Sequence, residues 1–331
     1  MTASAGARPL VVLAGPINPE AQAMLAREAE VVVAQDLGED AVARLAREAQ
    51  GILFRSRPDC SASLMAACPR LIVVGRHGAG LDIVDVPAAT RLGVAVVHSP
   101  GANAPAVAEH ALMLMLMCAK RAVQVDRWTR DGDWRARRDA LNEELGGKTL
   151  GIVGLGNIGR RVAGFGKALG MRVLAYDKYL PAEEVRRRGA EPMASLEALL
   201  PEVDVLTCHT PLTEETRAMI DERTLGLMKR GAILVNTSRG PVHEERAVFE
   251  ALATGRLGAA GLDVWNEEPS SVDNPIFGLP NVVCSQHVAG VTVQANRAVG
   301  VQVVSEMLRV LRGERPEVLV NPEVWPRLRQ R

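Results

Sequence analysis

The segment from Lys148 to Asp177 constrains the fold most strongly, because it combines a strand, a glycine turn, a helix and a second strand. Three of its glycines, Gly154, Gly156 and Gly159, follow the spacing G-x-G-x-x-G. Such glycines allow a tight turn, a close approach of a pyrophosphate to the backbone, and close packing of the helix on the strand. The helix directs its N-terminal N–H groups and the positive end of its dipole toward the phosphates. The segment therefore predicts a dinucleotide-binding unit.

The second strand of this unit ends on an acid, Asp177, 23 positions after Gly154. An acid at this place accepts hydrogen bonds from the ribose hydroxyls of the adenosine. Its charge would repel a 2′-phosphate, so the sequence predicts NAD rather than NADP as the cofactor. Lys178 follows directly and would soften that repulsion. A glycine-rich turn that binds nothing would not need the acid.

The order of strands and helices predicts two α/β domains with parallel sheets. A chain of 331 residues is long enough for about two domains. Short apolar strands alternate with helices through residues 1–102, where no G-x-G-x-x-G occurs, and again after Asp177. Such alternation is typical of parallel sheets that carry helices on both faces. The stretch 99–105, SPGANAP, is rich in residues that break helices and strands and is predicted to be a linker.

Charge and apolar content exclude several classes of partner. Lys+Arg and Asp+Glu both number 39, so no excess of positive charge favours nucleic acid. The most apolar run, 111–119, is too short to span a bilayer. The five cysteines show no metal-ligand spacing, which predicts reduced thiols and no metal site. The N-terminus lacks the apolar core of a signal peptide, and the predicted location is the cytoplasm.

A long helix is predicted over residues 106–128. Its Leu and Met side chains at 112–117 are apolar nearly all round, so the helix must be buried on several sides. A subunit interface would bury it in this way, and an internal core position is the alternative.

Three charged residues follow later strands and carry the candidate chemistry. Arg239 lies in NTSRG, Glu268 in GLDVWNEEP and His287 in SQHVAG. A guanidinium can hold a substrate carboxylate, and an imidazole can exchange a hydroxyl proton near neutral pH. A carboxylate beside the imidazole orients it. These types suit hydride transfer between a nicotinamide and a 2-hydroxy acid, although each residue alone also fits an ordinary surface or structural position.

Several stretches together resemble the D-2-hydroxyacid dehydrogenase family, which contains glycerate, D-lactate and 3-phosphoglycerate dehydrogenases. The matching stretches are RSR at 55–57, GRHGAGLDIVD at 75–85, NAPAVAEH at 103–110, GKTLGIVGLGNIG at 147–159, HTPLTEET at 209–216, NTSRG at 236–240, GLDVWNEEP at 261–269, NP at 274–275 and NVVCSQHVAGVT at 281–292. The resemblance implies a Rossmann-type NAD-binding domain, residues 103–290. This domain would be inserted into a flavodoxin-like substrate-binding domain formed by residues 1–102 and 291–331. It also implies homodimers made through the helix 106–128.

The resemblance implies a role for each site residue. Arg239 would bind and polarise the substrate, His287 would be the acid and base, and Glu268 would be the partner of His287. The residues implied to bind the cofactor are Gly154, Gly156, Asn157, Ile158, Gly159, Asp177, His209, Thr210, Pro211, Thr237 and Asp263. Those implied to bind the substrate are Arg55, Arg76, Ala79, Gly80 and Asn103. The remaining histidines, expected to be structural or surface residues, are His77, His98, His110 and His243.

The expected activity is NAD-dependent interconversion of a D-2-hydroxy acid and a 2-oxo acid. Candidate substrates are 3-phosphoglycerate, glycerate with hydroxypyruvate, and malate-like acids. A non-catalytic, NADH-sensing corepressor of the same fold is the alternative from another class. Basic side chains such as Arg57 and Arg135 suggest a second anionic group on the substrate, and a solvated basic loop is the alternative. The chain departs from the family pattern in having Gln286 for a usual Pro, and His243 for a usual apolar residue.

Overall fold

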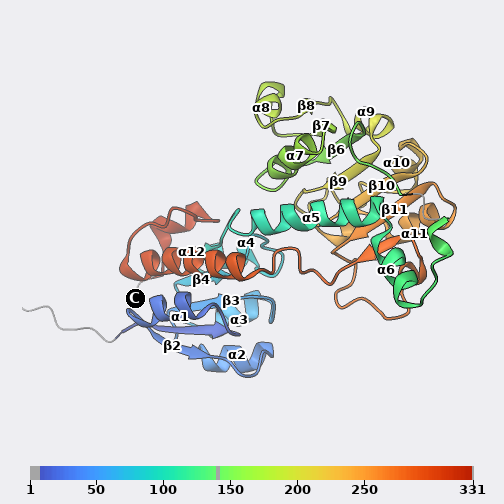
Figure 1. Cartoon of the computed structure of the whole chain (residues 1–331). Coiled ribbons are helices and arrows are strands. Elements are labelled where there is room, and N and C mark those ends of the chain that lie inside the picture. The colour runs from blue at the N-terminus through green and yellow to red at the C-terminus, as the bar shows by residue number, and fades with distance from the viewer. Residues whose placement is uncertain (1–7, 139–141, 330–331) are drawn as a thin grey trace, which may run out of the picture. The chain divides into compact units, whose positions relative to one another are not determined.

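The computed structural model describes residues 8–138 and 142–329. Its contacts divide the chain into two compact units, which Figure 1 draws together. One unit contains the residues up to Asn103 together with those from Val291 onward, and the other spans Ala104–Gly290. The chain therefore leaves the first unit, completes the second, and returns to the first.

The first unit is built on a five-stranded parallel sheet with the order β2-β1-β3-β4-β5. Its strands are β1 (Leu10–Ala14), β2 (Glu30–Val33), β3 (Gly51–Phe54), β4 (Val73–Arg76) and β5 (Ala95–Val97). Its helices are α1 (Pro19–Ala26), α2 (Glu39–Leu45), α3 (Ala62–Ala67), α4 (Val86–Arg91), α12 (Val293–Arg312) and η5 (Pro322–Arg327). Successive strand residues point to opposite faces, so Val12 packs with α2, α3 and α4, whereas Val11 packs with α1 and α12. The strand order is that of flavodoxin-like folds.

The second unit is built on a seven-stranded parallel sheet with the order β12-β11-β10-β9-β6-β7-β8. Its strands are β6 (Thr149–Val153), β7 (Arg172–Tyr176), β8 (Glu191–Pro192), β9 (Val205–Cys208), β10 (Ala232–Asn236), β11 (Leu257–Leu262) and β12 (Val282–Cys284). Numbered from β6, the order is the Rossmann order 3-2-1-4-5-6 with one further strand at the edge. The predicted α/β class, with a Rossmann-type domain inserted in a flavodoxin-like one and parallel sheets throughout, is confirmed.

Helices cover both faces of this second sheet. They are α5 (Ala104–Ala119), α6 (Ala122–Arg130), η1 (Ala136–Arg138), α7 (Gly159–Ala168), α8 (Ala182–Arg187), α9 (Leu196–Leu199), η2 (Leu200–Glu202), α10 (Glu222–Leu227), η3 (Gly240–Val242), α11 (Glu245–Ala253) and η4 (Pro275–Gly278). Ile152 of β6 faces the core shared with α5, α7 and α8, and its neighbour Val153 faces the core shared with α9, α10 and α11. The strands are buried on both faces, which explains their nearly continuous apolar runs.

The predicted single helix over 106–128 is wrong in its extent. The structure has two helices there, α5 and α6 (Figure 1). Lys120 and Arg121 lie between them. Arg121 adopts a left-handed conformation, with φ 49° and ψ 38°, so the ladder of helical hydrogen bonds ends at this residue. Nine residues of α5 are buried, whereas none of α6 is. Only the first part of the predicted helix is therefore a core element of its own unit.

Within the described ranges, no helix is both long enough and apolar enough to cross a membrane.

Candidate active site

The predicted catalytic residues come together at one edge of the second sheet. Arg239, Glu268 and His287 follow the carboxyl ends of β10, β11 and β12, which are neighbours in the sheet. Side chains that follow adjacent parallel strands meet at the same edge, and this edge is where such sheets bind ligands. All three residues belong to one unit, so their mutual geometry is set within it.

His287 and Glu268 form a hydrogen-bonded pair. His287 Nδ1 lies 2.7 Å from Glu268 Oε2, and Glu268 Oε1 accepts from the N–H of Trp265 at 3.1 Å. Burial raises the pKa of Glu268, but the hydrogen bonds from His287 and Trp265 and the positive charge of Arg239 outweigh it, so the pKa falls below its ordinary value. An ionised carboxylate only accepts, so Nδ1 carries the proton and Nε2 is the ring atom that can meet a substrate. The two side chains are 46% and 37% exposed.

Arg239 is held in an extended conformation by the turn that follows β10. Its Nη1 donates to the carbonyl oxygen of Ser238 at 2.7 Å, and its own carbonyl accepts from Asn236 Nδ2 at 2.9 Å. The next residue must be glycine, because a Cβ at Gly240 would lie 1.9 Å from the carbonyl oxygen of Trp265. This close approach fixes the turn that bears Arg239 against the loop that bears Glu268.

His243 stabilises the same turn through a contact with Asn236. Its side chain is 1% exposed, and its Nδ1 lies 2.9 Å from Asn236 Nδ2. Burial lowers the pKa of His243 to about 4, so the ring is neutral near pH 7 and Nδ1 can accept from the Asn236 amide. That amide also donates to the carbonyl of Arg239. The histidine that replaces the family's usual apolar residue is thus a buried structural group.

The glycine loop has the geometry that a dinucleotide requires. Gly154 has φ +87°, and a Cβ at Gly159 would lie 2.1 Å from the Gly154 carbonyl oxygen. Asn157 and Ile158 lie between the loop and α7, and no side chain caps the start of that helix. The helix α7 has ten residues, and its first N–H groups, which no side chain caps, can donate to phosphates.

Asp177 has a second task that its sequence position did not indicate. Its Oδ2 accepts from the N–H of Leu155 at 2.8 Å, and its Oδ1 accepts from the N–H of Tyr179 at 3.0 Å. Leu155 lies between the first two motif glycines, so the carboxylate braces the loop as well as standing at the strand end. Lys178 is paired with Glu215, with Nζ 2.5 Å from Oε1, and that pair reduces its positive charge toward any nearby phosphate.

Four further residues predicted to bind the cofactor, His209, Thr210, Pro211 and Thr237, follow β9 and β10. His209 Nε2 lies 3.0 Å from Thr207 Oγ1, and its Nδ1 lies 3.4 Å from Thr237 Oγ1. Burial lowers the pKa of His209 to about 3, so the ring is neutral near pH 7. Thr210 Oγ1 is buried and has no hydrogen-bond partner within residues 8–138 and 142–329. Pro211 follows it directly. An orphaned hydroxyl beside the glycine loop fits a bound dinucleotide, which would supply the missing partner.

The predicted substrate residues belong to the other unit, where they share a sheet edge. Arg55 follows β3, and β4 ends at Arg76, which is paired with Phe54 in register. Arg55 Nη1 lies 3.3 Å from the Pro16 carbonyl oxygen, and Arg76 Nη1 donates to the His77 carbonyl. The turn with Ala79 and Gly80 comes next, and the Ala79 oxygen is 2.9 Å from His98 Nδ1. Asn103 is the last residue of this unit before α5.

Sequence reasoning missed the contacts that support the His287–Glu268 pair. Trp265 donates its N–H to Glu268 and its ring Nε1–H to the carbonyl of Ser285 at 2.9 Å. Ser285 Oγ lies 2.6 Å from Asp263 Oδ1 and 2.9 Å from His110 Nε2. The available signal was position, because Ser285 and Asp263 directly follow neighbouring strands, and His110 is a polar residue within an apolar helix.

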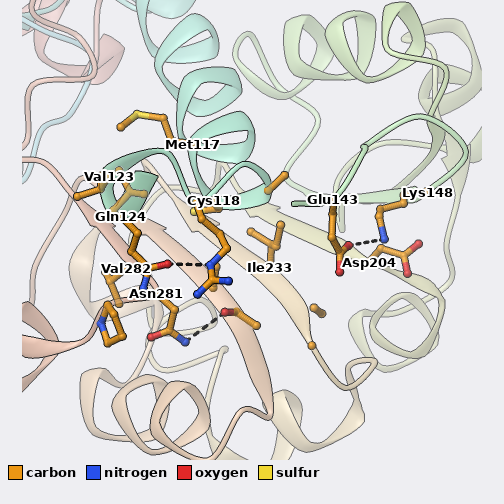
Figure 2. Close-up of a pocket in the computed structure, with 18 of the residues that line it drawn as sticks. Met117, Cys118, Val123, Gln124, Glu143, Lys148, Asp204, Ile233, Asn281 and Val282 are labelled. Carbon is orange, nitrogen blue, oxygen red and sulfur yellow. Dashed lines mark hydrogen bonds and ion pairs between the residues drawn. The ribbon is translucent and has the colours of Figure 1, made fainter. Parts of the chain in front are cut away.

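A cavity of about 350 Å³ lies at the opposite edge of the second sheet. Its lining includes Met117 and Cys118, from the end of α5, and Ile233 and Val282, from the starts of β10 and β12 (Figure 2). The ion pair between Lys148 Nζ and Glu143 Oε2, at 2.5 Å, lies on its rim. None of the predicted catalytic or cofactor residues lines this cavity. It is therefore separate from the site at the carboxyl ends of the strands.

Comparison with known proteins identifies relatives along most of the chain. Residues 112–289 match the family model described as "D-isomer specific 2-hydroxyacid dehydrogenase, NAD binding domain". The D-3-phosphoglycerate dehydrogenase of Archaeoglobus fulgidus is 37% identical over 318 residues, which cover 96% of this chain but 60% of that protein. The glyoxylate reductase of Aeropyrum pernix is 41% identical over 278 residues, 82% of each chain. The structure of a D-lactate dehydrogenase from Aquifex aeolicus, complexed with NAD and lactic acid, has a TM-score of 0.83 at 26% identity and covers 94% of this chain and 99% of its own.

Proposed function

Because the chain belongs to the D-isomer specific 2-hydroxyacid dehydrogenase family, we propose that it transfers a hydride between NAD(H) and a D-2-hydroxy acid/2-oxo acid pair. The observation that carries the proposal is the His287–Glu268 pair, which follows strands next to the one that bears Arg239. The chain spans about 60% of the length of the phosphoglycerate dehydrogenases that it matches.

The three side chains divide the work of the reaction. Arg239 binds the substrate carboxylate through two parallel hydrogen bonds and polarises the carbonyl group. In the reducing direction, His287 donates its Nε2 proton to the carbonyl oxygen, and in the oxidising direction Nε2 accepts the hydroxyl proton. Glu268 fixes the ring through Nδ1 and stabilises the positive charge that His287 carries before it gives up its proton.

The residues of the second unit fit a bound nicotinamide dinucleotide. Gly154, Gly156 and the start of α7 would hold the pyrophosphate, and Asp177 the adenosine ribose. Thr210 would gain a partner for its buried hydroxyl. When bound, NADH supplies the hydride that reduces the 2-oxo acid. Asp263, whose side chain has no exposed surface, stands beside the catalytic loop at the end of β11.

The experiment that tests this function is NADH oxidation with a panel of 2-oxo acids. We expect turnover with at least one of glyoxylate, hydroxypyruvate, 3-phosphohydroxypyruvate and oxaloacetate. The non-catalytic regulator of the same fold receives no support from the relatives, which are named as dehydrogenases and reductases. Absence of turnover with every acid, together with NADH-dependent binding of a protein partner, would favour that regulator.

The substrate is proposed to carry a second anionic group, either a phosphate or a second carboxylate. The support is the set of cationic side chains at the carboxyl ends of β3 and β4, where Arg55 and Arg76 are half-buried and Arg57 is exposed. A guanidinium set of this kind binds phosphate or carboxylate groups well. The same panel addresses this point, because a kcat/KM no higher for 3-phosphohydroxypyruvate or oxaloacetate than for glyoxylate would contradict it.

The cofactor is NAD, and its preference over NADP is assigned to Asp177. Asp177→Asn removes the charge but keeps an oxygen that can accept from Leu155 N–H. We expect it to raise NADPH affinity relative to NADH by about tenfold, because a repulsion between two nearby charges is lost. Fluorescence titration of both cofactors measures the ratio. A wild-type protein that already binds NADPH more tightly would contradict the assignment.

The two units are proposed to divide the binding functions. The family model for the NAD-binding domain covers residues 112–289, which lie inside the unit Ala104–Gly290. The other unit would contribute the substrate-binding residues, with backbone N–H groups of Ala79 and Gly80 toward the substrate carboxylate.

A homodimer through α5 and the adjoining α6 is proposed as the assembly. The apolar surface that these helices leave uncovered supports it, because Met113 is 39% exposed and Val123 is 48% exposed. Met113→Asp should convert a dimer to a monomer in sedimentation experiments, because it would bury a charge in the interface. Val272→Asp is the matched control, since Val272 is 89% exposed and belongs to neither helix but to the loop between β11 and η4. A monomeric wild-type protein would refute the proposal.

A further inference from the structure

The loop that carries His287 is folded around the buried carboxylate of Asp263. Asp263 Oδ1 accepts from Ser285 Oγ at 2.6 Å and from the N–H of Val288 at 2.9 Å. Its Oδ2 accepts from the N–H of Ala289 at 2.9 Å. The N–H of His287 donates to the carbonyl oxygen of Asp263 at 2.6 Å. A carboxylate without exposed surface needs these donors, so the residues on both sides of His287 are fixed by one anchor.

His110 of α5 completes this network from the neighbouring helix. Its Nε2 lies 2.9 Å from Ser285 Oγ and 3.6 Å from Asp263 Oδ1, and its side chain is 14% exposed. Ser285 has one hydroxyl proton, which goes to the carboxylate because an ionised carboxylate only accepts. Ser285 Oγ must then accept from His110, so Nε2 of His110 carries a proton. A directed chain of hydrogen bonds therefore runs from His110 through Ser285 to Asp263.

We propose that His110 and Ser285 are positioning residues that hold His287 in hydrogen-bonding register with Glu268, an inference that rests on the function proposed above. Ser285 is fixed on two sides, since its carbonyl accepts from Trp265 Nε1 and its hydroxyl from His110. Trp265 in turn donates its backbone N–H to Glu268. The network thus reaches both members of the catalytic pair.

His287 needs such support because of its own backbone. Its φ is +57°, in the left-handed region that residues other than glycine rarely adopt. A conformation of this kind persists only where the surroundings determine it. The hydrogen bonds to Asp263 from the residues on both sides of His287 hold this backbone conformation. Within that network, the hydroxyl of Ser285 is the group that His110 of α5 contacts.

Removing the Ser285 hydroxyl tests the inference. Ser285→Ala leaves the Nε2 proton of His110 and one lone pair of Asp263 without their partner, so the loop should relax. We expect kcat for the best 2-oxo acid to fall about tenfold, with KM for NADH changed by less than about twofold. Ser285→Thr and His110→Gln keep a hydroxyl and an N–H donor and should retain most of kcat. The double variant His110→Leu/Ser285→Ala should lose no more kcat than Ser285→Ala alone, because both substitutions break the same series of hydrogen bonds.

A spectroscopic measurement makes the test independent of turnover. The Nδ1 proton of His287, held by Glu268, should give a downfield NMR resonance in the wild-type protein that broadens or disappears in Ser285→Ala and persists in Ser285→Thr. Ser63→Ala, at an exposed serine of the other unit, is the control and should change neither readout. A folded Ser285→Ala protein with wild-type kcat and an unchanged resonance would overturn the inference. If the wild-type protein reduces no 2-oxo acid, the proposed function fails, while the resonance still decides whether Ser285 positions His287.

Discussion

Replacing His287 by Asn lowers kcat/KM for 2-oxo acid reduction by about 10³-fold, because the protein loses the group that delivers a proton to the carbonyl oxygen. Asn can occupy the space and can bond to Glu268, but it has no proton to give near neutral pH. The affinity for NADH, measured by fluorescence titration, should stay close to that of the wild-type protein, since His287 is not among the residues proposed to hold the dinucleotide.

Glu268→Gln tests separately the two roles of Glu268, which are to orient the His287 ring and to stabilise its positive charge. A Gln oxygen can still accept from His287 Nδ1 and keep the ring oriented, but it does not stabilise the imidazolium. We therefore expect a smaller loss than in His287→Asn. If His287→Asn retained most of the wild-type kcat/KM, the assignment of His287 as acid and base would be wrong. Its 2.7 Å contact with Glu268 would then have a structural role only.

Arg239→Ala should lower kcat/KM by about 10²- to 10³-fold, because it removes a charge-assisted interaction with the substrate at the reacting centre. Arg239→Lys should recover only part of this loss, since a single ammonium cannot bind both carboxylate oxygens in parallel. Steady-state kinetics with a saturating concentration of NADH measures both variants.

The matched control is Arg246→Ala. The Arg246 side chain is 87% exposed on α11, and it lies 3.5 Å from Glu250, so its removal takes away a surface charge of the same kind. We expect wild-type kinetics from it, because exposed ion pairs contribute little. Equal behaviour of Arg239→Ala and Arg246→Ala would show that Arg239 does not bind the substrate.

The fold was predictable because its strands are short, apolar and buried on both faces, and because one glycine segment defines the dinucleotide unit. Helix extents were less predictable. The periodicity over 106–128 gives no sign of the left-handed Arg121 that ends α5. A similar pattern over 216–228 predicts one helix, but α10 covers Glu222–Leu227 alone. Its start is fixed by a capping box between Asp221 and Thr224, a local hydrogen-bond choice that apolar spacing does not record.

The positions of the proposed catalytic residues after strands could be predicted, but the contacts that support these residues could not. The contact between His110 and Ser285 joins residues 175 positions apart. The approach of Gly240 to Trp265 likewise depends on how two loops pack. Such contacts arise from tertiary structure and have no counterpart in local spacing, so the sequence alone could not identify the network around Asp263.

The brace between Asp177 and Leu155 limits how this protein could be re-engineered toward NADPH. Neutralising the acid at the end of the second strand would remove its repulsion of a 2′-phosphate. Here the same carboxylate also ties down the phosphate loop. A substitution that removes the acceptor would widen specificity at the expense of loop order, so affinity for both cofactors would decline together. Libraries at this position are best restricted to side chains that keep an oxygen within reach of the Leu155 amide.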